Sequence, residues 1–291
     1  MDLKQITVSD RDLFREYAAK LGQTDSESSF TTAFLWQDYF KPQYLLHNNT
    51  LTVLSGKSSP VPFHTFPLGD GSVKETMMLL RDFFFSQYNS YIVRGITEKT
   101  KALIEDAVPG MFEFEEKRSM GDYVYNTDDL IHLAGKKYHS KRNHVNRFES
   151  SYNWAYSKID KTNLKQCAEF VNDITIKRNP DPTNEINAMN RLFSNYFSLG
   201  VTGACLTVDG QIVAVTVGER LFDTALIQVE KADTSFDGAY AAINRMFLKN
   251  EFSDCRYVNR EEDMGNEGLR KAKMSYHPAF IYTKYIAKPI K

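Results

Sequence analysis

Four consecutive charged residues follow directly on a short β-prone run that ends at Asn259: Arg260, Glu261, Glu262 and Asp263. A helical pattern starts after Gly265 and places Leu269, Ala272 and Tyr276 on one side. A strand that ends in opposite charges at a helix start is typical of the carboxyl edge of an open α/β sheet, where such folds bind ligands. We therefore expect a functional site at this edge. A solvated loop whose acids favour a helix N-terminus is the alternative interpretation.

A second candidate stretch, Leu130–Ser150, combines an apolar stripe with basic residues. The stripe has three- and four-residue steps and predicts a helix with one buried side: Ile131, Ala134, Tyr138, Val145, Phe148 and Tyr152. Between Leu130 and Phe148 there is no acid, and five cations contribute a charge of +5: Lys136, Lys137, Lys141, Arg142 and Arg147. Because the whole chain has a formal net charge of −1, this segregation favours a face for phosphate or another polyanion over a merely solvated helix face.

The elements that must position these residues form an α/β unit in the second half of the chain. The run Ala204–Gly218 alternates about Asp209-Gly210, which predicts a β-hairpin with a two-residue turn. The pattern then predicts the remaining elements in this order: a strand over 225–230, a helix opened by Gly238, a strand over 256–259, the helix after Gly265 and a last strand over 279–286.

The first half of the chain has a similar order of elements. Tyr44–Leu54 predicts two strands folded back at Asn48-Asn49, and a helix starts after Gly69–Ser72. Gly71 lies 167 residues before Gly238, and Tyr91 lies 166 residues before Tyr257. We interpret this as a tandem duplication of one α/β (α+β) unit, with domains over 1–128 and 129–291. The second domain would begin with the basic helix, and chance similarity of element order is the alternative.

Composition restricts the possible classes of protein. A chain of 291 residues with 42% apolar content is long enough for two cores, and a pI near 6.6 excludes a generically basic nucleic-acid coat. No run is long and apolar enough for a signal peptide or a membrane span, so we expect a cytoplasmic protein. The three cysteines lie in apolar runs, which favours reduced thiols, and no spacing is typical of a metal site. Nothing in the sequence predicts an oligomeric state.

The element order and two motifs resemble known families. A hairpin, strand, glycine-opened helix, strand, helix and closing strand resemble the GNAT fold of N-acyltransferases, and the first half resembles a degenerate copy. The stretches GKKYHSKRNHVNRF and NREEDMGNEGLRKAKMSYHP are similar to those of a bacterial family related to the C-terminal catalytic domain of phosphatidylglycerol lysyltransferases. That group is similar in turn to the Fem aminoacyltransferases. The resemblance implies two tandem GNAT-like domains, each with a mixed, mostly antiparallel sheet flanked by helices.

The resemblance also implies a reaction, namely transfer of an aminoacyl or acyl group onto an amine or hydroxyl. The donor would be aminoacyl-tRNA or acyl-CoA, with no permanently bound cofactor and no metal. Gly238 lies where the fold's donor-phosphate loop enters its helix. The usual acyl-CoA pattern has Arg or Gln three residues before this glycine and a small residue two after it, whereas this chain has Ser235 and Tyr240. Because Tyr240 would crowd a pyrophosphate, aminoacyl-tRNA is the favoured donor.

Particular residues follow from the same resemblance. Glu230 ends the strand before that loop, where members of the fold place a general base, and Tyr276 follows the next helix, where some place a general acid. Arg260 would hold a carboxylate or phosphate, with Asn259 beside it and an acid of Glu261–Asp263 receiving an amino group. A salt-bridge role for Glu230 and a core role for Tyr276 are the alternatives.

The partners stay open in part at this point. The basic residues Lys136, Lys137, Lys141, Arg142 and Arg147 would engage tRNA or another polyanion. The acceptor would be a small molecule or a lipid head group. The lipid-modifying relatives act beside a membrane-embedded domain that has no counterpart in these 291 residues, so phosphatidylglycerol is not carried over as the acceptor. An acyl-CoA-dependent N-acyltransferase of small molecules and a non-catalytic binding protein on the same fold are the two alternatives.

Overall fold

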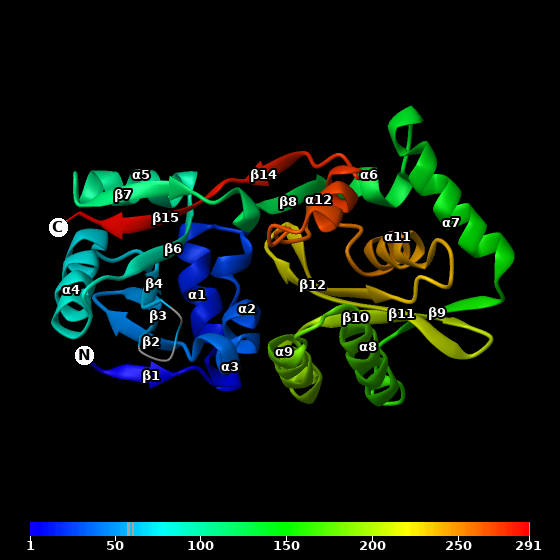
Figure 1. Cartoon of the computed structure of the whole chain (residues 1–291), viewed down its shortest axis with the longest axis horizontal. Coiled ribbons are helices and arrows are strands. Elements are labelled where there is room, and N and C mark those ends of the chain that lie inside the picture. Colours follow the sequence, from blue (N-terminus) through cyan, green and yellow to red (C-terminus); the bar gives the residue numbers. More distant parts are fainter. Residues whose placement is uncertain (57–58, 60, 291) are drawn as a thin grey trace. The chain divides into compact units, whose positions relative to one another are not determined.

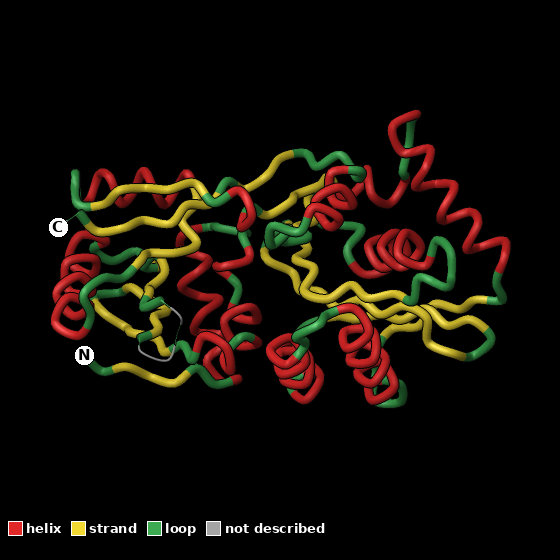
Figure 2. The backbone as a smooth tube through the Cα atoms, in the orientation of Figure 1, coloured by secondary structure: helices red, strands yellow, loops and turns green. Residues whose placement is uncertain are grey.

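The computed structural model describes residues 1–56, 59 and 61–290, and its contacts divide the chain into two units. The N-terminal unit consists of Met1–Asp122, Glu262–Asn266 and the segment from Tyr282 onward, and the C-terminal unit consists of Tyr123–Glu261 and Glu267–Ile281. Each unit has its own mixed sheet with helices packed against it (Figures 1 and 2). The expected fold class, two sheets flanked by helices, is confirmed.

The N-terminal sheet has the strand order β1-β2-β3-β4-β6-β15-β7, with β5 paired to β3. The predicted hairpin is present as β2 and β3, and its turn residues Asn48 and Asn49 both have positive φ, as a turn of this hand requires. The elements of this unit are β1 (Leu3–Gln5), α1 (Arg11–Leu21), α2 (Phe30–Leu35), α3 (Gln37–Phe40), β2 (Gln43–His47), β3 (Thr50–Ser55), β4 (Phe63–Thr65), β5 (Leu68–Gly69), α4 (Val73–Gln87), β6 (Ile92–Thr97), α5 (Glu98–Ala107), β7 (Phe112–Glu116) and β15 (Lys284–Pro289).

The C-terminal sheet has the strand order β14-β8-β13-β12-β11-β10-β9. Its helix α11 lies on one face, and α8 and α9 lie on the other (Figure 1). The elements of this unit are β8 (Asp122–Asn126), α6 (Thr127–His132), α7 (His139–Ser151), β9 (Trp154–Lys158), α8 (Leu164–Arg178), α9 (Thr183–Ser194), α10 (Tyr196–Leu199), β10 (Thr202–Val208), β11 (Gln211–Leu221), β12 (Thr224–Ala232), α11 (Ala239–Glu251), β13 (Tyr257–Asn259), α12 (Glu267–Met274) and β14 (Phe280–Tyr282).

One parallel strand pair recurs in both sheets. In the N-terminal sheet β4 and β6 are parallel and α4 connects them, and in the C-terminal sheet β12 and β13 are parallel and α11 connects them. The other strand pairs of both sheets, that of β8 with β14 set aside, are antiparallel. The matching βαβ crossover therefore supports a duplicated unit.

The last strand of the chain differs from the sequence interpretation. A single strand over 279–286 was expected to close the second sheet. The structure divides this stretch between the sheets: β14 lies at the edge of the C-terminal sheet, whereas β15 pairs with β6 and β7 in the N-terminal sheet. That expectation was wrong because an alternating strand suits either sheet, and alternation does not specify the partner.

The basic stretch is also not the single helix that its stripe predicts. It consists of the end of α6, a break, a short 3-10 turn over Lys136–Tyr138 and then α7. Leu133 and Gly135, both with positive φ, form the break. Val145 and Phe148 are buried on α7 as the stripe predicts, against the side of α11. In the described part of the chain, no helix is long and apolar enough to cross a membrane.

Candidate active site

A pocket of about 240 Å³ lies at the N-terminal end of α11 in the C-terminal unit. Its walls come from four parts of the chain: Lys141 and His144 of α7, the loop residues Thr234 to Gly238, the first turn of α11 from Ala239 to Ala241, and Tyr276 after α12. The pocket thus joins the basic helix, the glycine that opens α11 and the predicted general acid. It is smaller than the roughly 300–1,000 Å³ of typical small-molecule sites, so it accommodates one moiety of a larger ligand.

Gly238 fixes how closely α11 approaches α7. It has φ of +88°, and a Cβ atom at this position would lie 2.1 Å from the carbonyl oxygen of His144. No other residue type fits this backbone conformation and this approach without displacement. The first backbone N–H groups of α11 have no intrahelical acceptor and carry the positive end of the helix dipole. Because residues 238–241 line the pocket, that positive end faces the space where a ligand would lie.

Tyr276 and Lys141 meet at the wall of this pocket. Tyr276 is buried, and Lys141 Nζ lies 4.0 Å from the centroid of its ring, a cation–π contact. Burial raises the pKa of the Tyr276 phenol to about 12, so the phenol keeps its proton at neutral pH. Burial, and after it the charge of Arg260, lowers the pKa of Lys141. The pocket therefore contains a protonated phenol beside a half-buried amine.

Arg260 and Glu230 form an ion pair next to Tyr276. Arg260 Nη2 donates to Glu230 Oε1 at 2.6 Å, and Asn244 Nδ2 donates to Glu230 Oε2 at 2.8 Å. The Arg260 guanidinium carbon lies 4.8 Å from the centroid of the Tyr276 ring. Burial alone would lower the pKa of Arg260, but the Glu230 carboxylate outweighs it and the pKa is raised. Both Glu230 oxygens accept hydrogen bonds. This geometry is more typical of a residue that positions Arg260 than of a general base with a free oxygen.

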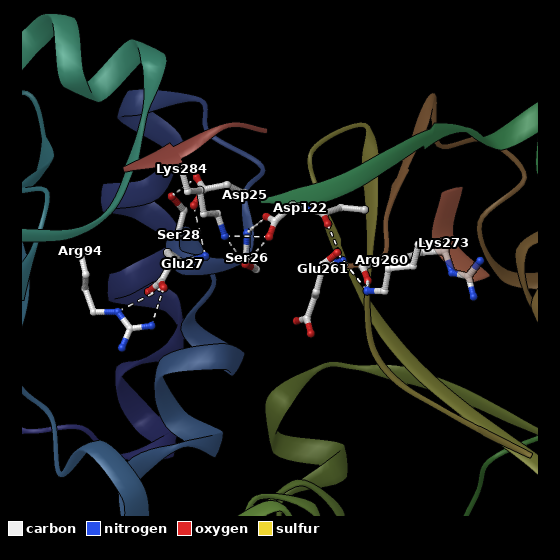
Figure 3. Close-up of polar contacts among 11 residues, drawn as sticks. Asp25, Ser26, Glu27, Ser28, Arg94, Asp122, Arg260, Glu261, Lys273 and Lys284 are labelled. Atoms are coloured by element: carbon white, nitrogen blue, oxygen red, sulfur yellow. Dashed lines mark hydrogen bonds and ion pairs between the residues drawn. The ribbon is translucent and has the colours of Figure 1, made fainter. Parts of the chain in front are cut away.

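Helix α12 buries a different side from the one that its pattern predicts. Tyr276 is buried as expected, but Leu269 is 38% exposed and Ala272 is exposed, whereas Lys273 is buried. Lys273 Nζ donates to the carbonyl oxygens of Arg260 and of Glu261, the second at 3.0 Å (Figure 3). The expected apolar face was wrong because backbone carbonyls at the end of β13 bind the Lys273 ammonium. Sequence reasoning missed Lys273, since one lysine among several basic helix residues carries no distinguishing pattern.

The four consecutive charges do not form one cluster. Arg260 and Glu261 belong to the C-terminal unit, where Glu261 N donates to the Asn259 side chain at 2.8 Å. Glu262 and Asp263 belong to the N-terminal unit. Burial raises the pKa of Glu262, and Arg118 Nη1 lies 3.4 Å from Asp263 Oδ2, a fully buried carboxylate. The three acids are therefore in different surroundings.

The N-terminal unit contains a buried charge cluster that sequence reasoning missed. Lys284 on β15 donates to Asp122 Oδ1 and to Ser26 Oγ, each at 2.7 Å (Figure 3). Nearby, Ser28 donates to Asp25 at 2.7 Å, and Arg94 Nη2 donates to Glu27 at 2.8 Å. Burial, offset in part by Lys284, raises the pKa of Asp25 to about 6. These residues are scattered from position 25 to position 284, so no local spacing could reveal them.

Most of the cations of the basic stretch have partners. Arg142 Nη1 donates to the carbonyl oxygens of Leu133 and Gly135, where it closes the break after α6. Lys137 lies 3.7 Å from Asp129, and Arg147 pairs with Asp237, whose pKa Arg147 lowers. Lys136 is exposed and forms no ion pair or hydrogen bond within the described residues. The stretch is thus less available to a polyanion than its charge suggests, and Lys141 is its member in the pocket.

Comparison with known proteins adds a family to this geometry. The family model described as phosphatidylglycerol lysyltransferase, C-terminal, matches residues 18–288. The chain is also 28% identical over 179 residues to an uncharacterised protein of Mycoplasmoides gallisepticum. That match covers 59% of this chain and 57% of the relative, so the chain spans little more than half the length of this curated relative.

Three solved structures are similar over nearly the whole chain. A conserved protein of unknown function from Bacteroides thetaiotaomicron is 33% identical, with a TM-score of 0.93 and full coverage of both chains. The L-PGS structure from Bacillus licheniformis has 16% identity and a TM-score of 0.71, covering 99% of this chain and 93% of its own. FemX has 11% identity and a TM-score of 0.64, covering 99% and 97%. These likenesses confirm the tandem GNAT-like fold.

Proposed function

The chain belongs to the phosphatidylglycerol lysyltransferase C-terminal family and is an acyltransferase of the aminoacyl-transferring kind, and from this we infer its reaction. We propose that it moves an aminoacyl group from aminoacyl-tRNA onto an amine or a hydroxyl acceptor. The observation that carries this proposal is the pocket in which the Tyr276 phenol, Lys141 and the first turn of α11 meet.

The donor binds with its terminal phosphate at the first turn of α11. Ala239 N donates to the carbonyl oxygen of Phe236, so the turn offers the N–H groups of Tyr240 and Ala241, and Lys141 adds a cation on the α7 side. A pocket of about 240 Å³ holds one moiety, while the rest of a polynucleotide lies across the open surface beside it. Tyr240 stands in the first turn, where a second phosphate of a pyrophosphate would need space. This arrangement favours the single phosphodiester of a tRNA end over acyl-CoA.

Tyr276 supplies the proton that the leaving group needs. The acceptor nitrogen or oxygen attacks the ester carbonyl carbon, the bond from that carbon to the ribose oxygen breaks, and the ribose oxygen takes the Tyr276 phenolic proton. The phenolate that forms is stabilised by Lys141, 4.0 Å from its ring centroid, and by Arg260, at 4.8 Å. The proton released by the acceptor then returns to the phenolate, so the enzyme is regenerated without a separate base.

Glu230 acts on this reaction through Arg260. Its two oxygens are held by Arg260 and Asn244, so the carboxylate fixes the guanidinium against the Tyr276 ring. This role replaces the general-base role that the resemblance implied. Among the predicted amino-group ligands we retain Glu261, since Glu262 belongs to the other unit, where burial raises its pKa, and Asp263 pairs with Arg118. The Asn259 side-chain oxygen accepts a hydrogen bond from the backbone N–H of Glu261 and so orients Glu261.

An acyl-transfer assay tests the proposal. The protein is incubated with tRNA charged in separate reactions with each labelled amino acid, together with extracts of small amines and of lipids as acceptors. We expect acceptor-dependent loss of label from tRNA and its recovery in a new ester or amide product. The proposal is wrong if no charged tRNA loses its label with any acceptor while an acyl-CoA thioester, at about 100 times its dissociation constant, stabilises the protein by roughly 2.7 kcal/mol.

A further inference from the structure

Arg178, the last residue of α8, contacts Tyr240, a residue of the pocket wall. Helix α8 lies on the face of the C-terminal sheet opposite α11 (Figure 1). Arg178 nevertheless reaches α11 around the end of β12. Its Nη2 donates to the carbonyl oxygen of Ala232, the last residue of β12, at 2.9 Å, and its Nη1 donates to the Tyr240 hydroxyl at 2.5 Å.

The Arg178 guanidinium is held in place, and it forms no ion pair with any carboxylate that the structure describes. Its carbon lies 5.3 Å from the centroid of the Tyr240 ring, so stacking and two hydrogen bonds fix its plane. Both acceptors are uncharged, and within the described residues no carboxylate lies in ion-pair range of Arg178. The nearby Asp233 carboxylate accepts hydrogen bonds from Ser235 N and Oγ, at 2.9 Å and 2.8 Å. Arg178 is exposed, so its remaining donors face solvent.

This state differs from that of the basic residues on α7. Arg147 forms an ion pair with Asp237, and Arg142 donates hydrogen bonds to two backbone carbonyl oxygens. Lys141 lines the pocket beside Tyr276, and Arg178 lies next to it against Tyr240. Neither forms an ion pair with a carboxylate of the described chain. Lys141 lines the pocket itself, whereas Arg178 reaches the pocket wall through the Tyr240 hydroxyl. An anion held in the pocket that extends past Tyr240 would therefore meet a cation from α7 and then another from α8.

We propose that Arg178 is a phosphate-binding residue of the donor site and contacts a phosphate next to the one held by the first turn of α11. This inference rests on the proposed function only in taking the ligand to be a phosphate-bearing donor. The contacts come from a planar guanidinium fixed in advance, which matches two phosphate oxygens at little cost in side-chain entropy. On a tRNA end this phosphate is the next phosphodiester along the strand, beyond Tyr240. The diphosphate of coenzyme A, which Tyr240 would crowd, is the competing source of the same chemistry.

Equilibrium binding tests the inference with two probes, uncharged tRNA and free coenzyme A, each titrated over a series of salt concentrations. Arg178→Gln is expected to weaken tRNA binding roughly tenfold, the loss of one charged hydrogen-bonded contact. It should also reduce the slope of log affinity against log salt by about 1. Lys165→Gln, the same loss of charge at the other end of α8, where Lys165 is 89% exposed, is the control and should leave both values unchanged.

A further variant separates direct contact from an effect through Tyr240. Tyr240→Phe removes the hydroxyl that Arg178 binds but keeps the ring and the guanidinium charge, so its salt slope should equal that of the wild type. Two results would overturn the role of Arg178 while leaving the proposed function intact. One is a salt slope reduced as much in Tyr240→Phe as in Arg178→Gln, and the other is an Arg178→Gln variant that binds tRNA as tightly as the wild type. Loss confined to coenzyme A would keep Arg178 but contradict tRNA as donor. Binding of neither probe by the wild type would overturn both proposals.

Discussion

Arg260 and Glu230 lie 30 positions apart in sequence but form an ion pair of 2.6 Å, with side chains only 13% and 11% exposed. Removing one partner of a buried pair leaves an uncompensated charge, which typically costs about 3–5 kcal/mol. We therefore expect Glu230→Ala to lower the free energy of unfolding by about that amount, measured by urea denaturation. Glu230→Gln keeps the shape and one carbonyl acceptor for Arg260 but also leaves the charge uncompensated, so it should lose a large part of the same free energy and less than Glu230→Ala.

The exposed pair Arg220–Asp254 provides the control for this change, because its side chains are 42% and 72% exposed. Asp254→Ala should alter the free energy of unfolding far less than Glu230→Ala, since water screens the charges. Equal effects of the two variants would mean that Glu230 does not compensate a buried Arg260.

Lys273 should be required for the geometry of Arg260. Lys273→Met keeps the length of the side chain but leaves the carbonyl oxygens of Arg260 and Glu261 without their ammonium donor. We expect a loss of about 2–3 kcal/mol in the free energy of unfolding. A double-variant cycle combines Lys273→Met with Arg260→Lys. Lys273→Met should reduce the transfer rate less in the Arg260→Lys background than in the wild type, because both changes act through the Arg260 guanidinium.

Lys271 on the same helix is the matched control. It is exposed, and Lys271→Met should change stability by no more than about 0.5 kcal/mol and leave transfer intact. If Lys271→Met and Lys273→Met behave alike, or if the effects of Lys273 and Arg260 simply add, the account of Lys273 is wrong.

Asp25 should make the stability of the N-terminal unit depend on pH. Burial raises its pKa from 3.8 to about 6, so the folded chain binds a proton that the unfolded chain has lost. This contribution to stability is fully present below about pH 3.8 and is lost as the pH rises through 6. Asp25→Asn removes the titration, and its stability relative to the wild type should increase between pH 4 and pH 7, measured by denaturant titration at each pH.

The wild-type curve alone would hide this effect. Burial lowers the pKa of His64 from 6.5 to about 4, so His64 contributes with the opposite sign: its share of the stability is lost as the pH falls through this range. The difference between wild type and Asp25→Asn cancels the His64 contribution. A difference that is constant over pH 4–7 would show that Asp25 titrates normally.

Local patterns predicted the parts of the fold that depend on neighbours in sequence. The Asp209-Gly210 hairpin, the strand over 257–259 and the helix behind Gly238 are all present, since turn chemistry and periodicity are set within a few residues. Patterns failed where a distant partner decides the outcome. The segment after Ala279 divides between two sheets, and α12 buries Lys273 because carbonyls of another element bind it.

The candidate site divides in the same way. Gly238 and Tyr276 were expected from their places along the chain, and both line the pocket. Two other features depend on contacts between residues 14 to 62 positions apart in sequence. They are the hydrogen bonds of Glu230 with Arg260 and Asn244, and the contact of Tyr240 with Arg178. Charge composition alone therefore overstated the free cations of the basic stretch and could not reveal the contact of Arg178 with Tyr240.

The transfer rate of Tyr276→Phe tests the central claim most directly, because this change removes the proposed proton donor and keeps the ring between Lys141 and Arg260. Tyr156→Phe, which removes the hydroxyl that donates to Glu251, is the control. We expect Tyr276→Phe to lower the rate of aminoacyl transfer by roughly 10²–10⁴-fold, with donor affinity and stability close to those of the control. A Tyr276→Phe variant that transfers at the wild-type rate would contradict the account.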